Sequence, residues 1–303
     1  MRALDFIFAA RPLLVMPVWS VFLVALRYHH HLAGKNFQTG DFLNLAGLSL
    51  VFAGALYLNQ VFDYESDLIN EKLGFLQKNV ISLKAMMSAY LVVTLTALVI
   101  GIFISVVTLA VYLQIFVAGY IYSAPPWRLK DRVVSSLLIN GYAYGFLVAL
   151  SIMPHINLHN AGLLGWDSPF YFFITIMSIT CITTIPDIKG DRATGKRTVA
   201  VRLGSRGALG LAFLLMALSV YPAHRSGFLE LVYLSVVSAL LILVTLFVNS
   251  EKMILFTAKF PLLLVTLLAG YFYPLYFLFI VALLIFTRIY YKKRFNLTYP
   301  EMA

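Results

Sequence analysis

The chain consists mostly of long apolar runs that short polar segments separate. A run of roughly 17 to 25 apolar residues is long enough to cross a bilayer as a helix. Ten spans are predicted, at 12–27, 41–63, 83–105, 107–124, 133–154, 168–187, 207–224, 228–248, 254–271 and 273–290. Because Pro261 and Pro274 interrupt the last two runs, the sequence leaves open whether 254–290 forms one span or two.

Composition supports an all-α, polytopic membrane protein. The 303 residues are 61% hydrophobic and 12% charged, whereas soluble domains carry about a quarter charged residues. The alternating period of a membrane β-barrel is absent. The first apolar run follows Arg2 and Arg11 but continues into Arg27 without a small-residue cleavage site, so we predict a first span rather than a removable leader. We expect a single integral-membrane domain, 1–303.

The net charge of +10 is concentrated in the loops between spans, which indicates a topology signal rather than a nucleic-acid partner. Lys72, Lys78 and the basic stretches 128–132 and 189–206 fall on one side, while the loop 155–167 contains neither Lys nor Arg. By the positive-inside rule, the basic side and the N-terminus are cytoplasmic. We therefore predict a cell-membrane protein, surrounded by lipid, whose motif-bearing loops face the cytoplasm.

Two aspartate pairs with the same spacing end the second and the sixth predicted spans. Asp63 and Asp67 follow Asn59 at four-residue intervals, and Asp187 and Asp191 repeat the spacing. Residues four apart share one face of a helix, so each set is predicted to form a polar stripe at the cytoplasmic end of its span. Acids near a membrane surface are often solvated caps, but two such pairs on one side favour a common cavity.

The repeated spacing also suggests two related halves, about 1–130 and 131–303.

Four carboxylates around one cavity repel each other strongly, by ~3 kcal/mol for two charges about 5 Å apart at an effective dielectric of 20. A cation between them removes this repulsion. Hard oxygen ligands suit Mg²⁺, which commonly bridges protein carboxylates to the phosphates of a substrate.

Basic residues lie close in the sequence to the second acid pair or to a proline turn. Arg128 and Lys130 follow the helix-breaking pair Pro125-Pro126, and Lys196 and Arg197 follow the second acid pair. Part of this charge serves topology. Carboxylates that bind metal, together with Arg and Lys side chains, are also the composition of a diphosphate site.

These motifs resemble those of the UbiA superfamily of intramembrane prenyltransferases. The N-x-x-x-D-x-x-x-D of residues 59–67 is similar to the first family motif, and the D-I-K-G-D of 187–191 is similar to the second. The stretches 122–130 and 196–204 also resemble the family and stand in the same order. The resemblance extends from near residue 11 to the end of the chain.

The resemblance implies nine helices around a central cavity with a cytoplasmic cap, one helix fewer than the ten spans predicted above. The implied activity is Mg²⁺-dependent transfer of an isoprenyl chain from a polyprenyl diphosphate to an aromatic or lipid acceptor. Two Mg²⁺ ions are expected to bridge the diphosphate to the catalytic residues Asn59, Asp63, Asp67, Asp187 and Asp191, with the four aspartates as metal ligands. The candidate substrate-binding residues are Arg11, Lys72, Tyr122, Arg128, Lys130, Arg192, Lys196 and Arg197.

The chain also departs from the family pattern. Gln60 stands where many members have Asp, and 70–78 lacks the usual Pro and Arg, so Lys72 or Lys78 is the candidate to supply that cation. Aromatic faces attract cations, so five tyrosines are candidates to line the cavity, although ordinary packing accounts for most such rings. These are Tyr57, Tyr120, Tyr122, Tyr142 and Tyr144.

Two other classes of membrane protein use intramembrane carboxylates. An ion-coupled transporter holds them near mid-bilayer, whereas these acids end their spans beside basic loops. A CDP-alcohol phosphotransferase carries its acids in one compact run with interleaved Gly and Ala-Arg, which is missing here. The sequence leaves open the acceptor, the length of the prenyl chain and the oligomeric state.

Overall fold

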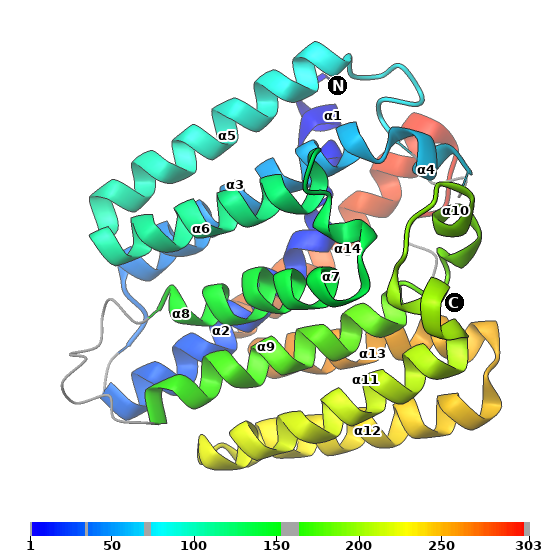
Figure 1. Ribbon diagram of the computed structural model, residues 1–303. Helices are drawn as coiled ribbons and strands as arrows, with labels where there is room; N and C mark the ends of the chain where they lie inside the picture. Colours follow the sequence, from blue (N-terminus) through cyan, green and yellow to red (C-terminus); the bar gives the residue numbers. More distant parts are fainter. Residues whose placement is uncertain (1, 34–35, 70–73, 153–163, 300–303) are drawn as a thin grey trace.

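The computed structural model describes residues 2–33, 36–69, 74–152 and 164–299, and these residues form helices without a strand (Figure 1). Two segments depart from α geometry, the 3₁₀ turn η1 and the π-helix η2. The elements are α1 (Arg2–Ala9), α2 (Pro12–Ala33), α3 (Thr39–Phe62), α4 (Tyr64–Ile69), α5 (Leu83–Ile104), α6 (Val106–Ser123), η1 (Leu129–Asp131), α7 (Val133–Asn140), η2 (Gly141–Leu147), α8 (Val148–Leu150), α9 (Leu164–Thr183), α10 (Ile188–Ala193), α11 (Val199–Arg225), α12 (Leu229–Val248), α13 (Glu251–Phe272) and α14 (Pro274–Phe295).

Nine helical segments of the described chain are long and apolar enough to cross a membrane, as the resemblance implies. They are α2, α3, α5, α6, the continuous run Val133–Leu150, α11, α12, α13 and α14. The remaining predicted span, the sixth (168–187), corresponds to α9, a helix of 20 residues that falls outside this set. Its first turns contain Asp167, Ser168 and Pro169, which lower its hydropathy. The segment 254–290 forms two helices, which separate at Tyr273.

Local sequence signals set many of the helix ends. Ser82, Ser105 and Ser250 cap the starts of α5, α6 and α13, because each hydroxyl oxygen accepts a hydrogen bond from the backbone N–H three residues later. Asn249 and Asn296 end α12 and α14 in the left-handed conformation, which Asn tolerates better than most residues. These caps satisfy backbone groups that a helix end otherwise leaves unpaired.

The helices pack pairwise into a closed bundle. α2 contacts α3 and α13, α3 contacts α6, α6 contacts η2, η2 contacts α9, and α9 contacts α13. This closed sequence of contacts surrounds the cavities described below. The apolar window of α2 is mostly buried, whereas that of α5 is mostly exposed, so α5 lies on the outside of the bundle (Figure 1).

Small residues allow close approach at two of these contacts. A Cβ on Gly145 of η2 would lie 2.4 Å from the carbonyl oxygen of Phe172 on α9, so η2 lies directly against that helix. A Cβ on Gly119 of α6 would lie 2.8 Å from the Cβ of Ala55 on α3. Small residues at such contacts bring helix backbones together in membranes. They hold the walls of the bundle in place around its centre.

Candidate active site

Both acid pairs lie at breaks that follow a long helix. α3 ends at Phe62 and Asp63 adopts φ −97°, ψ 6°, while α9 ends at Thr183 and Asp187 adopts φ −91°, ψ 0°. The short helices α4 and α10 then begin. The prediction that the aspartates lie on the continuous helices of the spans themselves was therefore wrong.

Pro186 explains the second break, because proline lacks a backbone N–H and disfavours helical geometry in the residue before it. At both breaks the backbone still forms a hydrogen bond between the two aspartates, which are four residues apart. The backbone N–H of Asp67 donates to the carbonyl of Asp63 at 2.8 Å, and that of Asp191 donates to the carbonyl of Asp187 at 2.9 Å. The two acid pairs therefore share one local geometry, while the relation between two halves of the chain stays a prediction.

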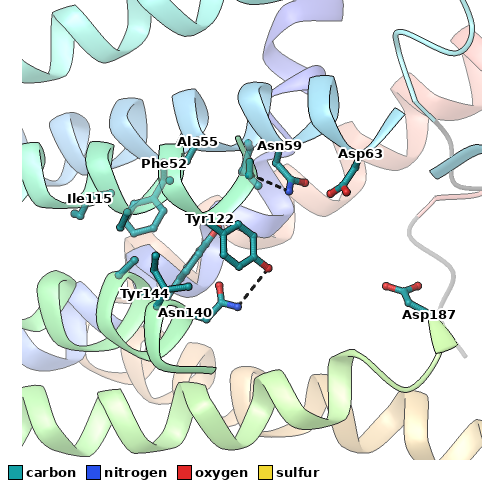
Figure 2. A pocket seen from close by; sticks show the side chains of 15 residues that line it. Phe52, Ala55, Asn59, Asp63, Ile115, Tyr122, Asn140, Tyr144 and Asp187 are labelled. Atoms are coloured by element: carbon teal, nitrogen blue, oxygen red, sulfur yellow. Dashed lines mark hydrogen bonds between the residues drawn. The ribbon is translucent and has the colours of Figure 1, made fainter. Parts of the chain in front are cut away.

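The two pairs face a common space. Asp63 and Asp187 lie opposite each other in Figure 2, and both line a cavity of about 250 Å³. All four aspartates line a second, adjoining cavity of about 370 Å³. The predicted convergence of the two acid pairs is thus present, although the helix breaks rather than the spans themselves present the side chains.

Two lysines neutralise Asp63. Lys130 Nζ lies 2.8 Å and Lys196 Nζ lies 3.1 Å from Asp63 Oδ1, and Lys196 also lies 3.5 Å from Asp191 Oδ1. Burial alone would raise the pKa of Asp63, but the two lysines outweigh it and hold that pKa at about 2. Burial lowers the pKa of Lys130, and Asp63 offsets part of this shift. The pKa of Lys196 is raised, because Asp63 and Asp191 together outweigh its burial.

Backbone contacts bring the two basic loops together. Arg132 and Arg197 form an isolated parallel β-bridge, in which the N–H of Arg197 donates to the carbonyl of Asp131 at 2.8 Å. The N–H of Lys196 donates to the carbonyl of Asp191 at 2.8 Å. Lys130 and Lys196 therefore approach the same carboxylate from loops that are far apart in the sequence.

Arg11 completes the charged cluster from the other side. Its Nη2 lies 3.4 Å from Asp67 Oδ2, and Asp67 is almost fully buried. The hydroxyl of Thr198 donates to Asp191 Oδ2 at 3.3 Å. Asp63, Asp67 and Asp191 thus each have a charged or polar partner from another part of the chain.

The first cavity extends from the acids into an apolar arm. Asn59, whose side chain donates to Ser123 Oγ at 3.4 Å, lies at the mouth of this arm (Figure 2). The deeper lining comes from α3, α6 and the α7–η2 segment. Its apolar residues are Phe52, Ala55, Leu56, Ile115, Ala118, Gly119, Ile139 and Ala143.

Tyr122, Asn140 and Tyr144 line both cavities and stand between them. Asn140 Nδ2 donates to the hydroxyl of Tyr122 at 3.4 Å (Figure 2). Asn140 was not among the predicted site residues. A signal for it existed, because an uncharged polar residue within an apolar span tends to be functional or paired. Tyr144 packs against Phe52 with ring centroids 4.5 Å apart.

Several predicted residues lie apart from this cluster. Arg128 pairs with Asp131 at 2.8 Å and does not line either cavity, and the side chains of Arg192 and Arg197 are exposed. Arg197 contributes through its backbone. Lys72 lies outside the described residues, so its predicted role stays a prediction.

Of the five candidate tyrosines, Tyr122 and Tyr144 line the cavities. Tyr57 donates to the carbonyl of Phe6, Tyr142 donates to Gln114, and Tyr120 is exposed. These last three rings line neither cavity, in keeping with the expectation that ordinary packing accounts for most such rings. In two of them the hydroxyl instead ties neighbouring elements together.

The donor set fits magnesium that a substrate helps to hold. Among the described residues, no three acidic, His or Cys side chains form a metal site by themselves. Mg²⁺ usually takes one or two carboxylates and completes its octahedral shell with water and substrate phosphates. Asp63 with Asp67, and Asp187 with Asp191, supply such incomplete oxygen sets on opposite sides of one cavity.

Comparison with known proteins establishes the family. The model described as "UbiA prenyltransferase family" matches residues 14–253. The chain belongs to this family. The fold agrees, because a UbiA homologue from Archaeoglobus fulgidus bound to GPP and Mg²⁺ superposes with a TM-score of 0.68. That match covers 88% of this chain and 98% of the homologue at 18% identity.

Relatives of this UbiA family member include plant and archaeal enzymes. A probable homogentisate phytyltransferase 2 from Oryza sativa is 30% identical over 181 residues, covering 55% of this chain and 46% of the relative. A digeranylgeranylglyceryl phosphate synthase from Sulfolobus acidocaldarius is 27% identical over 209 residues, covering 66% and 71%. The chain spans about half the length of the plant relatives that it matches.

Proposed function

We propose that this protein transfers an isoprenyl chain from a polyprenyl diphosphate to an acceptor within the membrane, with Mg²⁺. One observation carries the proposal. Two aspartate pairs face each other across the second cavity, which Lys130 and Lys196 also line, and the adjoining first cavity has an apolar arm. This arrangement matches the charge distribution of a prenyl diphosphate, which has an anionic head and an apolar tail.

The diphosphate lies between the acid pairs in this proposal. Asp63 and Asp67 on one side, and Asp187 and Asp191 on the other, would hold two Mg²⁺ ions that would offset the charge of the diphosphate, and Asn59 orients the diphosphate. Lys130 and Lys196 are within ion-pair distance of Asp63 and neutralise the remaining phosphate charge. The isoprenyl tail occupies the apolar arm that ends at Phe52 and Ile115.

Breaking the allylic C–O bond places negative charge on the leaving diphosphate and positive charge on the isoprenyl carbon. Bound magnesium lowers the energy of this step by stabilising charge on the phosphate oxygens. Lys130 and Lys196 stabilise the same charge without reorganising. The rings of Tyr122 and Tyr144 stand between the two cavities, where aromatic faces stabilise the allylic cation and exclude water.

In this proposal the diphosphate lies beside the aspartates of the second cavity, and the remainder of that cavity holds the acceptor. This cavity adjoins the first at Tyr122 and Asn140 and includes apolar residues such as Leu14 and Leu262. An acceptor bound there is held close to the isoprenyl carbon. The two reactants then need not meet by diffusion, which lowers the entropy cost of the reaction. One relative is named for homogentisate and another for a glyceryl phosphate lipid, so we propose an aromatic or lipid acceptor.

We also propose that the site faces the cytoplasm of the cell membrane. The loops that carry Lys130 and Lys196 are rich in Lys and Arg, and basic loops remain on the cytoplasmic side. An ion-coupled transporter lacks a supporting observation, because the acids lie at helix ends beside lysines rather than at mid-span.

The test uses the purified protein in detergent with Mg²⁺, labelled prenyl diphosphates of increasing length, and a panel of aromatic and lipid acceptors. We expect a prenylated product and stoichiometric release of diphosphate. Asp187→Asn should abolish both, whereas Glu65→Gln, which changes an exposed carboxylate near the same site, should not. Failure of the wild-type protein to consume any prenyl diphosphate, combined with ion flux in liposomes, would overturn the proposal.

A further inference from the structure

The first helix and the last helix of the described chain are locked together at the level of the acid motifs. Asp5 on α1 is 3% exposed and accepts three hydrogen bonds from α14. Tyr290 donates to Oδ1 at 2.5 Å, Arg294 Nε donates to Oδ1 at 3.0 Å, and Arg294 Nη2 donates to Oδ2 at 3.2 Å. Phe8 stacks on Tyr290 with ring centroids 3.9 Å apart. We call Asp5, Phe8, Tyr290 and Arg294 the terminal clasp.

A two-pronged contact between Arg and a carboxylate fixes both distance and orientation. The clasp therefore does more than hold α1 near α14, because it sets the angle at which α1 leaves the bundle. Both of its helices lie outside residues 14–253, which the family model matches. The family match accordingly assigns the clasp no role.

α1 leads directly to Arg11. The chain turns sharply between α1 and α2, where Arg11 adopts φ 52° and its N–H donates to the carbonyl of Phe8 at 3.0 Å. Left-handed backbone is strained for Arg, so surrounding contacts must hold it. α3 supplies some of these contacts, since Gln60 Nε2 donates to the carbonyl of Ala9 at 2.7 Å. The same α3 carries the first acid motif at its end.

The clasp also contacts the segment that follows the partner of Arg11. Arg11 pairs with Asp67 of α4, and the chain continues from α4 to Phe75. Phe75 is 2% exposed; its ring lies nearly parallel to that of Tyr290 of the clasp, with ring centroids 6.4 Å apart, and packs edge-on against Phe295 at 5.5 Å. The end of α14 thus lies between α1, which leads to Arg11, and the segment after Asp67.

We propose that the terminal clasp positions Arg11 over the acid site. Arg294 and Asp5 are positioning residues in this inference, because neither contacts the cavities and both act through the α1–α2 corner. Arg11 then offers a fixed guanidinium to the anionic substrate beside Asp67. The inference rests on the proposed function.

The test is a double-mutant cycle with steady-state prenyl transfer as the readout. Arg294→Gln should lower kcat/KM by about tenfold, since a displacement of around 1 Å at a positioned group costs up to about 100-fold. We expect the loss mainly in KM for the prenyl diphosphate. Arg294→Lys should restore part of it. In an Arg11→Gln background, Arg294→Gln should have almost no further effect, because residues that act through one group are not additive.

Arg288→Gln is the matched control, because it removes an exposed arginine from the same helix and should leave kcat/KM unchanged. If Arg294→Gln fails to fold, Tyr290→Phe removes one hydrogen bond to Asp5, keeps the ring stack, and enters the same cycle. Equal losses in the wild-type and Arg11→Gln backgrounds would overturn the inference while leaving the proposed function intact. A wild-type protein that transfers no isoprenyl chain would instead overturn the proposed function.

Discussion

Replacing Asp63 by Asn is the most direct perturbation of the site, because Asp63 is the counter-ion of two buried lysines. Its side chain is 13% exposed, and those of Lys130 and Lys196 are 5% and 9% exposed. The lysines hold its pKa at about 2, against an ordinary value of 3.8. A difference of nearly two pKa units corresponds to about 2 kcal/mol of stability in the unliganded protein at neutral pH.

The sign follows from the direction of the shift. The folded protein binds the Asp63 proton more weakly than the unfolded chain does, so the contribution is fully present above the ordinary pKa of the carboxyl. It is lost as the pH falls toward about 2. Asp63→Asn should therefore lower the unfolding temperature at pH 7, and thermal unfolding in detergent measures the difference.

The same substitution should abolish prenyl transfer, because a neutral amide binds Mg²⁺ more weakly than the carboxylate that it replaces. A cycle with Lys130→Met separates the two effects. Once Lys130 is absent, Asp63→Asn should cost less stability, whereas activity should remain lost. Asn substitution that leaves both the melting temperature and the transfer rate unchanged would refute the electrostatic account of this cluster.

Three further outcomes follow from the cavity walls and the lysines. Phe52→Ala removes a ring at the end of the apolar arm and should shift the preference toward longer prenyl diphosphates, measured by competition between two chain lengths; an unchanged ratio contradicts the placement of the tail. Lys130→Arg should extend activity to higher pH, since burial lowers the pKa of Lys130 while Arg stays protonated, and the pH profile of kcat/KM measures it. Asn140→Leu removes the hydrogen bond to Tyr122 and should slow transfer by about tenfold; calorimetric binding of the diphosphate should change little.

Residue 60 illustrates how the structure explains a departure from the family pattern. Gln60 lies within the first acid motif, at a position where many family members have Asp. The side chain instead points away from the acids and donates to the carbonyls of Ala9 and Leu56. It supports the corner that carries Arg11. An acid could not donate these hydrogen bonds when ionised.

Much of the fold was available from the sequence. Apolar runs that match the bilayer thickness specify spanning helices, since a backbone in lipid must satisfy its own hydrogen bonds. Nine predicted spans correspond to described helices that meet the length and apolarity of a membrane span, and the other, 168–187, corresponds to α9. The four aspartates and both lysines were also identified from the sequence, because two acid pairs with the same spacing end two spans on the side that carries the basic loops.

The sequence by itself determined the membrane-spanning helices, the family and the identities of the charged residues, because these depend on local composition and spacing. Only the tertiary structure decided which cations meet which acids. Pro186 predicts the helix break before Asp187, but no proline or glycine near Asp63 predicts the break after α3. The approach of Lys130 to Asp63 depends on a bridge between Arg132 and Arg197. Pairings across such distances come from packing of the whole bundle, and no local pattern encodes them.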